Sequence, residues 1–133
     1  MTDSSNKGIL ILATGIRGAI GSTLAAAVCA GKENPDLILP YLMTGQKFSW
    51  LGKPMDYQIA GWDVSEIPMT EALALEGVLE KGIWRPYAEA IDQVPVKAAP
   101  EPGTPLKAQV EQTKADITAF MDDHPGYSPV LVN

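Results

Sequence analysis

The chain has 133 residues, which is the size of one domain and too short for a two-domain enzyme. Its formal net charge is −6, and no cluster of lysine and arginine is present that would neutralise nucleic-acid phosphates. The composition therefore argues against a nucleic-acid partner. The single cysteine, Cys29, permits no intramolecular disulfide, fits a reducing cytoplasm, and is expected to be buried. Residues 1–7 are polar and lack a basic segment, so we interpret them as a disordered N-terminus ahead of one domain over 8–133.

The first predicted elements are a strand and a helix joined by a glycine-rich turn. Residues 8–13 form a continuous apolar run, typical of a strand buried on both faces of a parallel sheet. Good helix formers follow over 19–30, and Gly31 is expected just beyond the end of that helix. The stretch 8–31 is as long as a bilayer-spanning helix, but the central Arg17 and the clustered glycines argue against a membrane span.

The rest of the chain alternates between apolar runs, turns and helical patterns. We predict a strand over 36–43, which Pro40 places at an edge or ends early, then a loop over 44–56 and a strand over 56–60 that finishes at 61–63. A helix from Pro68 or Thr70 to 81 and a short helix after Arg85 and Pro86 are expected next, followed by an irregular connection over 94–105. The chain is expected to end with an amphipathic helix over 106–122, a turn over 124–129 and a buried strand over 130–133. The apolar side of the long helix is predicted to comprise Leu106, Val110, Ile117 and either Phe120 or Met121. This order predicts an α/β fold with three layers and a mostly parallel sheet.

The glycine pattern of residues 14–21, TGIRGAIG, lies directly between the first strand and the first helix. Gly15 lets the chain turn sharply off the strand, Gly18 lets backbone N–H groups approach a pyrophosphate, and Gly21 allows close packing of helix and strand. The N-terminus of the helix adds unpaired N–H donors and a partial positive charge. This context favours a Rossmann-like dinucleotide-binding domain over an ordinary glycine-rich turn.

The G-x-x-G-x-x-G spacing is shared by two families. Residues 14–21 match the TGxxGxxG pattern of extended short-chain dehydrogenases in full. Those enzymes use a Tyr-x-x-x-Lys catalytic pair, which this chain lacks. Four positions after Tyr41, Tyr57, Tyr87 and Tyr127 stand Gly45, Gly61, Ile91 and Leu131. A fragment of an NAD(P)-dependent epimerase or dehydrogenase, with that pair beyond residue 133, is the first alternative.

The other family resembles most of the chain. The segment ILATGIRGAIGSTLAAAV resembles the GxGGxxGSTL entry turn of myo-inositol-1-phosphate synthases. YQIAGWDVSEIPMTEALALEGVLE is similar to their Gly-Trp/His-Asp segment, and VEQTKADITAFMDDHPGYSPVLVN to the helix and strand before their Asn-x-x-Ser-Thr-Glu motif. The resemblance covers about residues 8–133 and implies the NAD-binding portion of an inositol-3-phosphate synthase-like isomerase. Such enzymes serve inositol and phospholipid biosynthesis, converting glucose 6-phosphate to inositol phosphate by transient oxidation, enolisation, aldol cyclisation and reduction.

The resemblance also implies which residues bind the cofactor. They lie in the glycine turn and at the end of the strand over 56–63: Gly15, Arg17, Gly18, Ala19, Ile20, Gly21 and Asp63. Arg17, Ala19 and Ile20 stand where glycine and two asparagines are common in the family. Arg17 is hypothesised to pair with a phosphate, so NADP stays open beside NAD. The alternative interpretation of Asp63 is a turn or helix N-cap residue.

The family's catalytic lysines, its full Asn-x-x-Ser-Thr-Glu motif and its oligomerising second domain have no counterpart in this chain, where Asn133 would be the first residue of that motif. We therefore expect a Rossmann-like domain truncated at its C-terminal edge, with unknown catalytic residues and no turnover by these 133 residues alone. The resemblance implies a small sugar phosphate substrate and a homo-oligomer of the full-length enzyme in the cytoplasm, with no membrane or nucleic-acid partner. A stand-alone nucleotide-binding module is the second alternative.

Other chemically distinctive residues favour structural interpretations. His124 is expected in a solvated turn, and one histidine and one cysteine far apart predict no metal site. Arg85 is expected either to face the site or to start a helix at the surface. Ser22 and Thr23 offer hydroxyl groups to a phosphate in the first helical turn, and the three tryptophans, Trp50, Trp62 and Trp84, are predicted to pack in the core.

Overall fold

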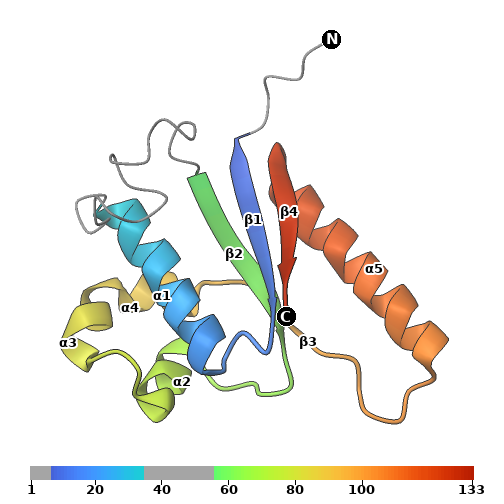
Figure 1. Ribbon diagram of the computed structural model, residues 1–133, viewed down its shortest axis with the longest axis horizontal. Helices are drawn as coiled ribbons and strands as arrows, with labels where there is room; N and C mark the ends of the chain where they lie inside the picture. Colours follow the sequence, from blue (N-terminus) through green and yellow to red (C-terminus); the bar gives the residue numbers. More distant parts are fainter. Residues whose placement is uncertain (1–6, 35–55) are drawn as a thin grey trace.

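The computed structural model of the chain describes residues 7–34 and 56–133 (Figure 1). The expectations for residues 1–6, for the strand over 36–43 and for the loop over 44–55 with Trp50 lie outside these residues. The elements are β1 (Gly8–Thr14), α1 (Ala19–Glu33), β2 (Asp56–Asp63), α2 (Met69–Glu76), α3 (Lys81–Trp84), the 3-10 helix η3 (Arg85–Tyr87), α4 (Ala88–Asp92), β3 (Val96–Ala98), α5 (Leu106–Asp123) and β4 (Tyr127–Val132).

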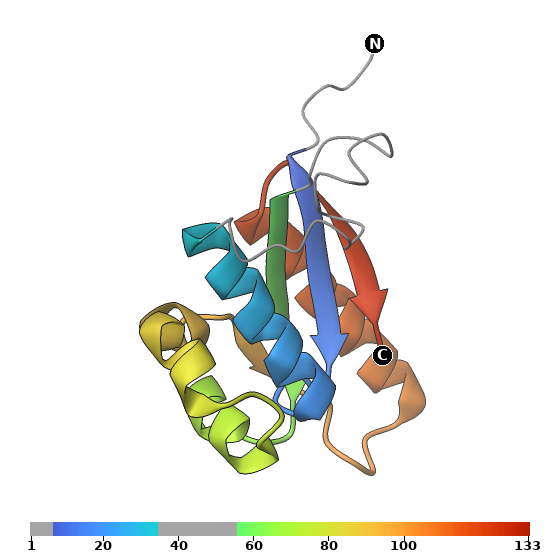
Figure 2. The ribbon, with the colours of Figure 1, turned by 60° about the vertical axis from the view of Figure 1, so that its left-hand side comes forward.

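The described strands form one parallel sheet in the order β3-β2-β1-β4. Helices α1 to α4 cover one face of this sheet and α5 covers the other (Figures 1 and 2). The predicted α/β fold with a three-layer, parallel arrangement is therefore confirmed. None of the helices in the described ranges is long and apolar enough to cross a membrane.

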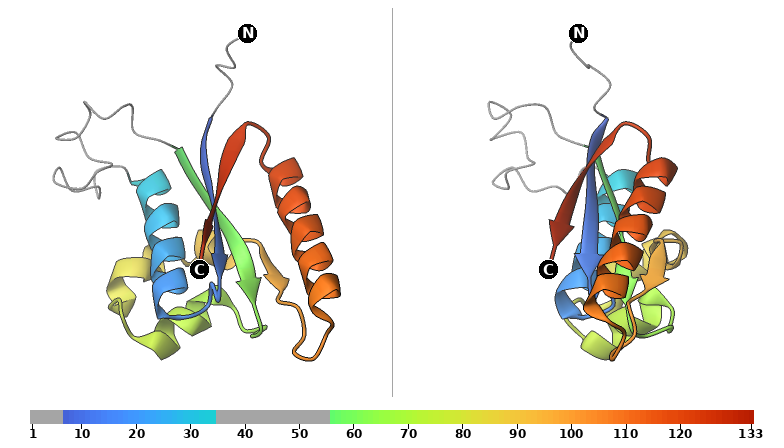
Figure 3. Two further views of the ribbon diagram at one scale, coloured as in Figure 1. Left: turned by 45° about the vertical axis from the view of Figure 1, so that its right-hand side comes forward. Right: turned by 90° about the vertical axis from the view of Figure 1, so that its right-hand side faces the viewer.

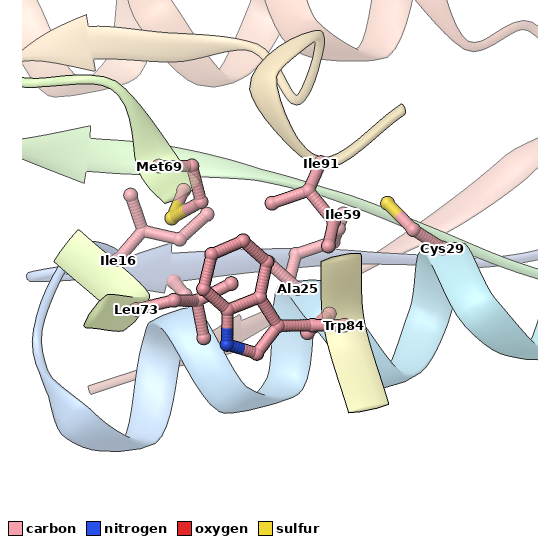
Figure 4. Packing of buried hydrophobic residues seen from close by; sticks show 10 residues of the cluster. Ile16, Ala25, Cys29, Ile59, Met69, Leu73, Trp84 and Ile91 are labelled. Atoms are coloured by element: carbon pink, nitrogen blue, oxygen red, sulfur yellow. The ribbon is translucent and has the colours of Figure 1, made fainter. Parts of the chain in front are cut away.

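Strand β1 is apolar from Gly8 to Ala13 because it supplies side chains to two cores. Leu10 and Leu12 pack with Phe120 on the α5 side, whereas Ile11 and Ala13 pack on the α1 side. Figure 4 shows the α1-side core, in which the Trp84 ring lies among residues of α1, α2 and β2. Trp62 packs edge-on against Phe120 in the other core, with ring centroids 5.3 Å apart. The predicted packing roles of Trp62 and Trp84 are confirmed, and Cys29 is buried, which raises the pKa of its thiol.

Two helix ends differ from the prediction. Gly31 lies inside α1, which continues to Glu33, so its predicted place beyond the helix is wrong. Helix α2 ends at Glu76 instead of continuing to 81, because Gly77 adopts a left-handed conformation (φ 65°) and its N–H donates to the Leu73 carbonyl at 3.1 Å. Glycine is a common residue at the C-terminal end of a helix, so either position could end one. The sequence alone does not show that Gly77, and not Gly31, adopts a positive φ.

Two strand predictions are also wrong. The proline-rich stretch 94–105 contains a short strand, β3, whose residues 96–98 pair with 61–63 at the end of β2. Strand β4 begins at Tyr127 and includes Pro129, which was expected in a turn. Within the described part of the chain β4 pairs only with β1, so Leu131 is 58 % exposed rather than buried. Proline is compatible with such an edge strand, where a ladder hydrogen bond can be missing.

Helix α5 contacts the sheet through the second half of its length. Phe120 is fully buried and Ile117 is partly buried against the sheet, and Asp116 accepts a hydrogen bond from the Trp62 indole N–H at 2.9 Å. Leu106 is 76 % exposed, and Val110 is also exposed. The amphipathic helix is thus confirmed, but only the C-terminal half of its predicted apolar side is in the core.

Phe120 and Met121 offer a direct comparison of the two sides of α5. We expect Phe120→Ala to lower the free energy of unfolding by about 3–5 kcal/mol, because it empties the core between α5 and the sheet. Met121 is 40 % exposed, and Met121→Ala should change stability by about 0.5 kcal/mol or less. Urea denaturation of both variants measures the difference, and equal losses would place the wrong residue in the core.

Tyr127 links β4 to the beginning of β2. Its hydroxyl donates to the Asp56 carboxylate, and this hydrogen bond, which favours the protonated phenol, raises the pKa of Tyr127. A pKa that is higher in the folded state contributes stability below the unfolded pKa of about 10 and loses that contribution as the pH rises through the folded pKa. We therefore expect the stability of the wild type to fall more steeply above pH 10 than that of Tyr127→Phe. Urea denaturation of both proteins over this pH range measures the difference. Parallel profiles of stability against pH would contradict this role of Tyr127.

Candidate functional site

The C-terminal ends of the parallel strands lie together at one edge of the sheet, where α1 also begins (Figures 2 and 3). From β1 the chain passes through α1 toward β2 and β3 on one side, and it later returns to place β4 on the other side of β1. The strand order therefore switches direction between β1 and β4. In open α/β sheets, ligands bind outside the carboxyl ends of the strands at such a point.

The glycine-rich turn leaves β1 through Gly15, whose φ is 62°, a conformation that side chains with a Cβ rarely adopt. Ile16 then inserts into the core, and its N–H donates to the Trp62 carbonyl at 3.1 Å. A Cβ on Gly21 would lie 2.5 Å from the Ile16 carbonyl oxygen. The helix therefore packs closely at Gly21, as expected. Its neighbour there is the glycine-rich turn at Ile16, and not the strand as predicted.

The first turn of α1 presents backbone donors without partners. Gly18 is the N-cap residue, and no side chain caps the helix. Within the described ranges, the N–H groups of Ala19, Ile20 and Gly21 donate to no other group, as is usual for the first residues of a helix. These three donors and the positive end of the helix dipole suit an anionic group such as a phosphate.

The hydroxyl groups of this helical turn are not free to donate. The Ser22 hydroxyl is fully buried and donates to the Gly18 carbonyl at 2.7 Å. The Thr23 hydroxyl donates to the Ala19 carbonyl, also at 2.7 Å. In this structure both hydroxyl protons are therefore used within the helix, and that either of them turns to a phosphate stays a prediction.

Asp63 joins the end of β2 to the glycine-rich turn. Its Oδ2 accepts a hydrogen bond from the Arg17 backbone N–H at 2.8 Å, and its Oδ1 accepts one from the Ser65 N–H at 2.8 Å. The hydrogen bond to Ser65 closes a local turn, which is one of the alternative roles that the sequence left open for Asp63. The N-cap interpretation is wrong, because α2 begins after Pro68. One carboxylate thus fixes two loops that are 46 residues apart along the chain.

A pocket of about 430 Å³ lies beside this carboxylate, between the ends of β2 and β3. Arg17 and residues 63–66 line one side, and residues 96–102 line the other. Val64 is 82 % exposed and so presents an apolar side chain to whatever enters the pocket. The volume lies within the range of about 300–1,000 Å³ that is typical of small-molecule sites.

The sequence-predicted site residues occupy one region of the structure. Arg17 and Asp63 line the pocket together, and the remaining five, Gly15, Gly18, Ala19, Ile20 and Gly21, belong to the turn and the first residues of α1. The side chain of Ile20 is 80 % exposed. Sequence reasoning missed residues 64–66 of the pocket. They directly follow Asp63 at a predicted strand end, and that position could have indicated them. Sequence reasoning also missed residues 96–102, because their prolines and alanines indicate only a loop.

His124 and Arg85 lie outside this region. His124 follows α5 and its Nδ1 is 2.7 Å from the Phe120 carbonyl oxygen, so it closes the helix end at the opposite edge of the sheet. Arg85 is exposed at the start of η3 and does not line the pocket. Over residues 7–34 and 56–133 no group of histidine, cysteine, aspartate and glutamate is arranged to hold a metal ion.

Models of known protein families give no match to this chain, and the curated protein sequences give none either. The chemistry of the site is therefore inferred from its own geometry.

Proposed function

We propose that this chain binds a nicotinamide dinucleotide of the NAD type along the C-terminal edge of its sheet. The observation that carries the proposal is the hydrogen bond from the Arg17 N–H to Asp63. It places an acidic strand end against a glycine-rich turn, next to the unpaired donors of α1 and the pocket. An acidic residue and a glycine-rich helix start in this relation are the two elements that recognise the ribose and the pyrophosphate of a dinucleotide.

The donor and acceptor counts support this ligand. A carboxylate has about four acceptor sites, and the two backbone N–H groups occupy two of those on Asp63. The two that are left equal the number of hydroxyl groups on an adenosine ribose. The pyrophosphate is the anion for the N–H groups of residues 19–21. Val64 on one side of the pocket, and the alanines and prolines of residues 96–102 on the other, supply apolar surface against which a planar base can pack.

The absence of side chains at Gly15 and Gly18 of the turn also fits a dinucleotide. A Cβ at Gly15 would meet nothing within 4 Å, and one at Gly18 would meet only the Gly15 carbonyl oxygen, at 3.2 Å. The surface over the turn is therefore open, so that a phosphate can approach the backbone closely. The chemistry that NAD supplies when bound is reversible hydride transfer, while this chain positions its ADP half.

We further propose that the parent activity is that of an inositol-3-phosphate synthase-like isomerase. Two of the motifs that resemble this family, the GSTL start of α1 and the Gly-Trp-Asp end of β2, lie at the proposed site. The proposal includes a sugar phosphate substrate, a cytoplasmic location and a homo-oligomeric full-length enzyme. No catalytic residue is assigned to this chain, whose described part supplies contacts to the cofactor.

Isothermal titration calorimetry with the 133-residue chain tests the binding proposal. We expect NAD and ADP both to bind at one site, and nicotinamide mononucleotide to bind much more weakly, because the pocket lies on the adenosine side. Val64→Asp should weaken binding of NAD and ADP by about tenfold or more, since it replaces an apolar contact with the base by a further negative charge in the pocket.

Val78→Asp is the matched control, because Val78 is also exposed but does not line the pocket. It should bind both ligands like the wild type. If titration with NAD or ADP produces no heat of binding and neither ligand raises the melting temperature of the chain, the proposed function is wrong.

A further inference from the structure

The two walls of the pocket are held in place in different ways. Residues 96–98 of one wall pair with β2, and the Ala99 N–H donates to the Asp63 carbonyl oxygen at 3.0 Å. The other wall, residues 64–66, belongs to the loop between β2 and α2, where the side chain of Val64 is exposed. Little apolar packing fixes this loop, so its position depends on hydrogen bonds.

Arg17 holds this loop from the glycine-rich turn. Its Nη1 donates to the Ser65 carbonyl oxygen, and its backbone N–H donates to Asp63 Oδ2. The other carboxylate oxygen of Asp63 accepts the Ser65 N–H at 2.8 Å. Both backbone groups of Ser65 are therefore bound, the N–H by Asp63 and the carbonyl by Arg17. Together the three hydrogen bonds close a ring that joins the turn to the loop.

The guanidinium of Arg17 is poorly placed to bind an anion in the pocket. Its Nε is buried and has no hydrogen-bond partner among the described residues, so a ligand cannot reach this atom. The charged residues that line the pocket are Asp63, Glu66 and Glu101 beside Arg17 and Lys97. A phosphate there would meet more negative than positive charge. Since burying an unpartnered N–H lowers stability, the value of Arg17 lies in what its Nη1 holds.

We propose that Arg17 is a positioning residue, which holds the loop after β2 so that the pocket is ready for the adenosine half of the dinucleotide. This inference rests on the proposed dinucleotide site and gives the Arg17 side chain a role other than contact with the ligand. A loop that is ordered before the ligand arrives loses less conformational entropy on binding. Removing the bond to Ser65 should therefore weaken every ligand that packs on the wall at Val64, whatever the charge of that ligand.

Arg17→Met tests this role, because methionine keeps an unbranched side chain but has no N–H donor. NMR titrations of the 133-residue chain compare adenosine, which has no phosphate, with ADP. We expect Arg17→Met to weaken the binding of both ligands by the same factor, about tenfold. A residue that pairs with a phosphate would affect ADP alone, and that result overturns the positioning role.

Hydrogen exchange of the free chain gives a second readout that needs no ligand. The Ser65 amide should exchange about tenfold faster in Arg17→Met than in the wild type. The amide of Ile11, in the interior strand β1, should exchange at the same rate in both proteins. Faster exchange at both amides would show a general loss of stability, and it overturns the positioning role.

Arg85→Met is the matched control, because Arg85 is exposed and does not line the pocket. It should leave both affinities and the exchange of Ser65 unchanged. Arg17→Lys retains a charged donor and should recover part of the adenosine affinity that Arg17→Met loses. Unchanged exchange at Ser65 or unchanged adenosine affinity in Arg17→Met overturns the positioning role. A wild type that binds neither adenosine nor ADP overturns the proposed function instead.

Discussion

Asp63→Asn is expected to weaken NAD binding by about tenfold or more and to lower the free energy of unfolding by about 1–3 kcal/mol. The carboxylate accepts the N–H groups of Arg17 and Ser65 at once. An asparagine has one acceptor oxygen, so its amide N–H₂ would face one of these two donors. Calorimetry and urea denaturation measure the two effects, which should appear together because one carboxylate both holds the turn and receives the ribose.

Asp92→Asn is a matched control. The Asp92 carboxylate also accepts two hydrogen bonds, from the Thr70 N–H at 2.9 Å and from the Thr70 hydroxyl at 3.0 Å. There an asparagine can accept from the N–H and donate to the hydroxyl oxygen, so both contacts can be kept. Asp92 does not line the pocket, and NAD affinity should not change. If Asp63→Asn behaves like this control, Asp63 does not bind the ribose and does not hold the turn.

Gly21→Ala is expected to destabilise the fold by about 1–3 kcal/mol and to weaken NAD binding. The added methyl group would lie 2.5 Å from the Ile16 carbonyl oxygen and 2.6 Å from the Ile16 Cα, so the turn or the start of α1 must move. Such a shift displaces the N–H groups that the proposal assigns to the pyrophosphate. Thermal unfolding with and without NAD measures both consequences.

Gly31→Ala provides the opposite expectation within the same helix. A methyl group there meets nothing within 4 Å, and alanine is the better helix former by about 0.5–1 kcal/mol. We expect this variant to be slightly more stable than the wild type and to bind NAD equally well. A destabilised Gly31→Ala together with a stable Gly21→Ala would contradict the packing of α1 on the turn.

The local order of strand, turn and helix over residues 8–31 is predictable from the sequence because each step has a strong chemical signal. A continuous apolar run, three glycines spaced three residues apart and a run of helix formers follow one another without ambiguity. Asp63 was predicted to be a site residue through the resemblance rather than through any local pattern, and it lines the pocket. Its hydrogen bond to Arg17 could not be foreseen, because it depends on β2 lying beside β1 in a register that places Trp62 opposite Thr14.

Besides the two helix ends at Gly31 and Gly77, sequence reasoning got wrong the features that long-range strand pairing sets. The segment containing β3 has too many prolines nearby to indicate a strand, and it becomes one because β2 offers it an edge at residues 61–63. The apolar residues of β4 predict burial, but the strand pairs with β1 alone among the described strands and exposes Leu131. The wall of the pocket formed by residues 96–102 depends on β3, which explains why it was missed.

The central claim, that the C-terminal edge of the sheet binds a dinucleotide through the glycine-rich turn and Asp63, is tested most directly by an NMR titration of the ¹⁵N-labelled chain with NAD. The account predicts saturable shift changes in the amides of residues 15–21, 63–66 and 96–102. The amides of Asp56 and His124, at the opposite edge, should not change. Saturable shifts confined to that opposite edge, or no shifts at millimolar NAD, would contradict the account.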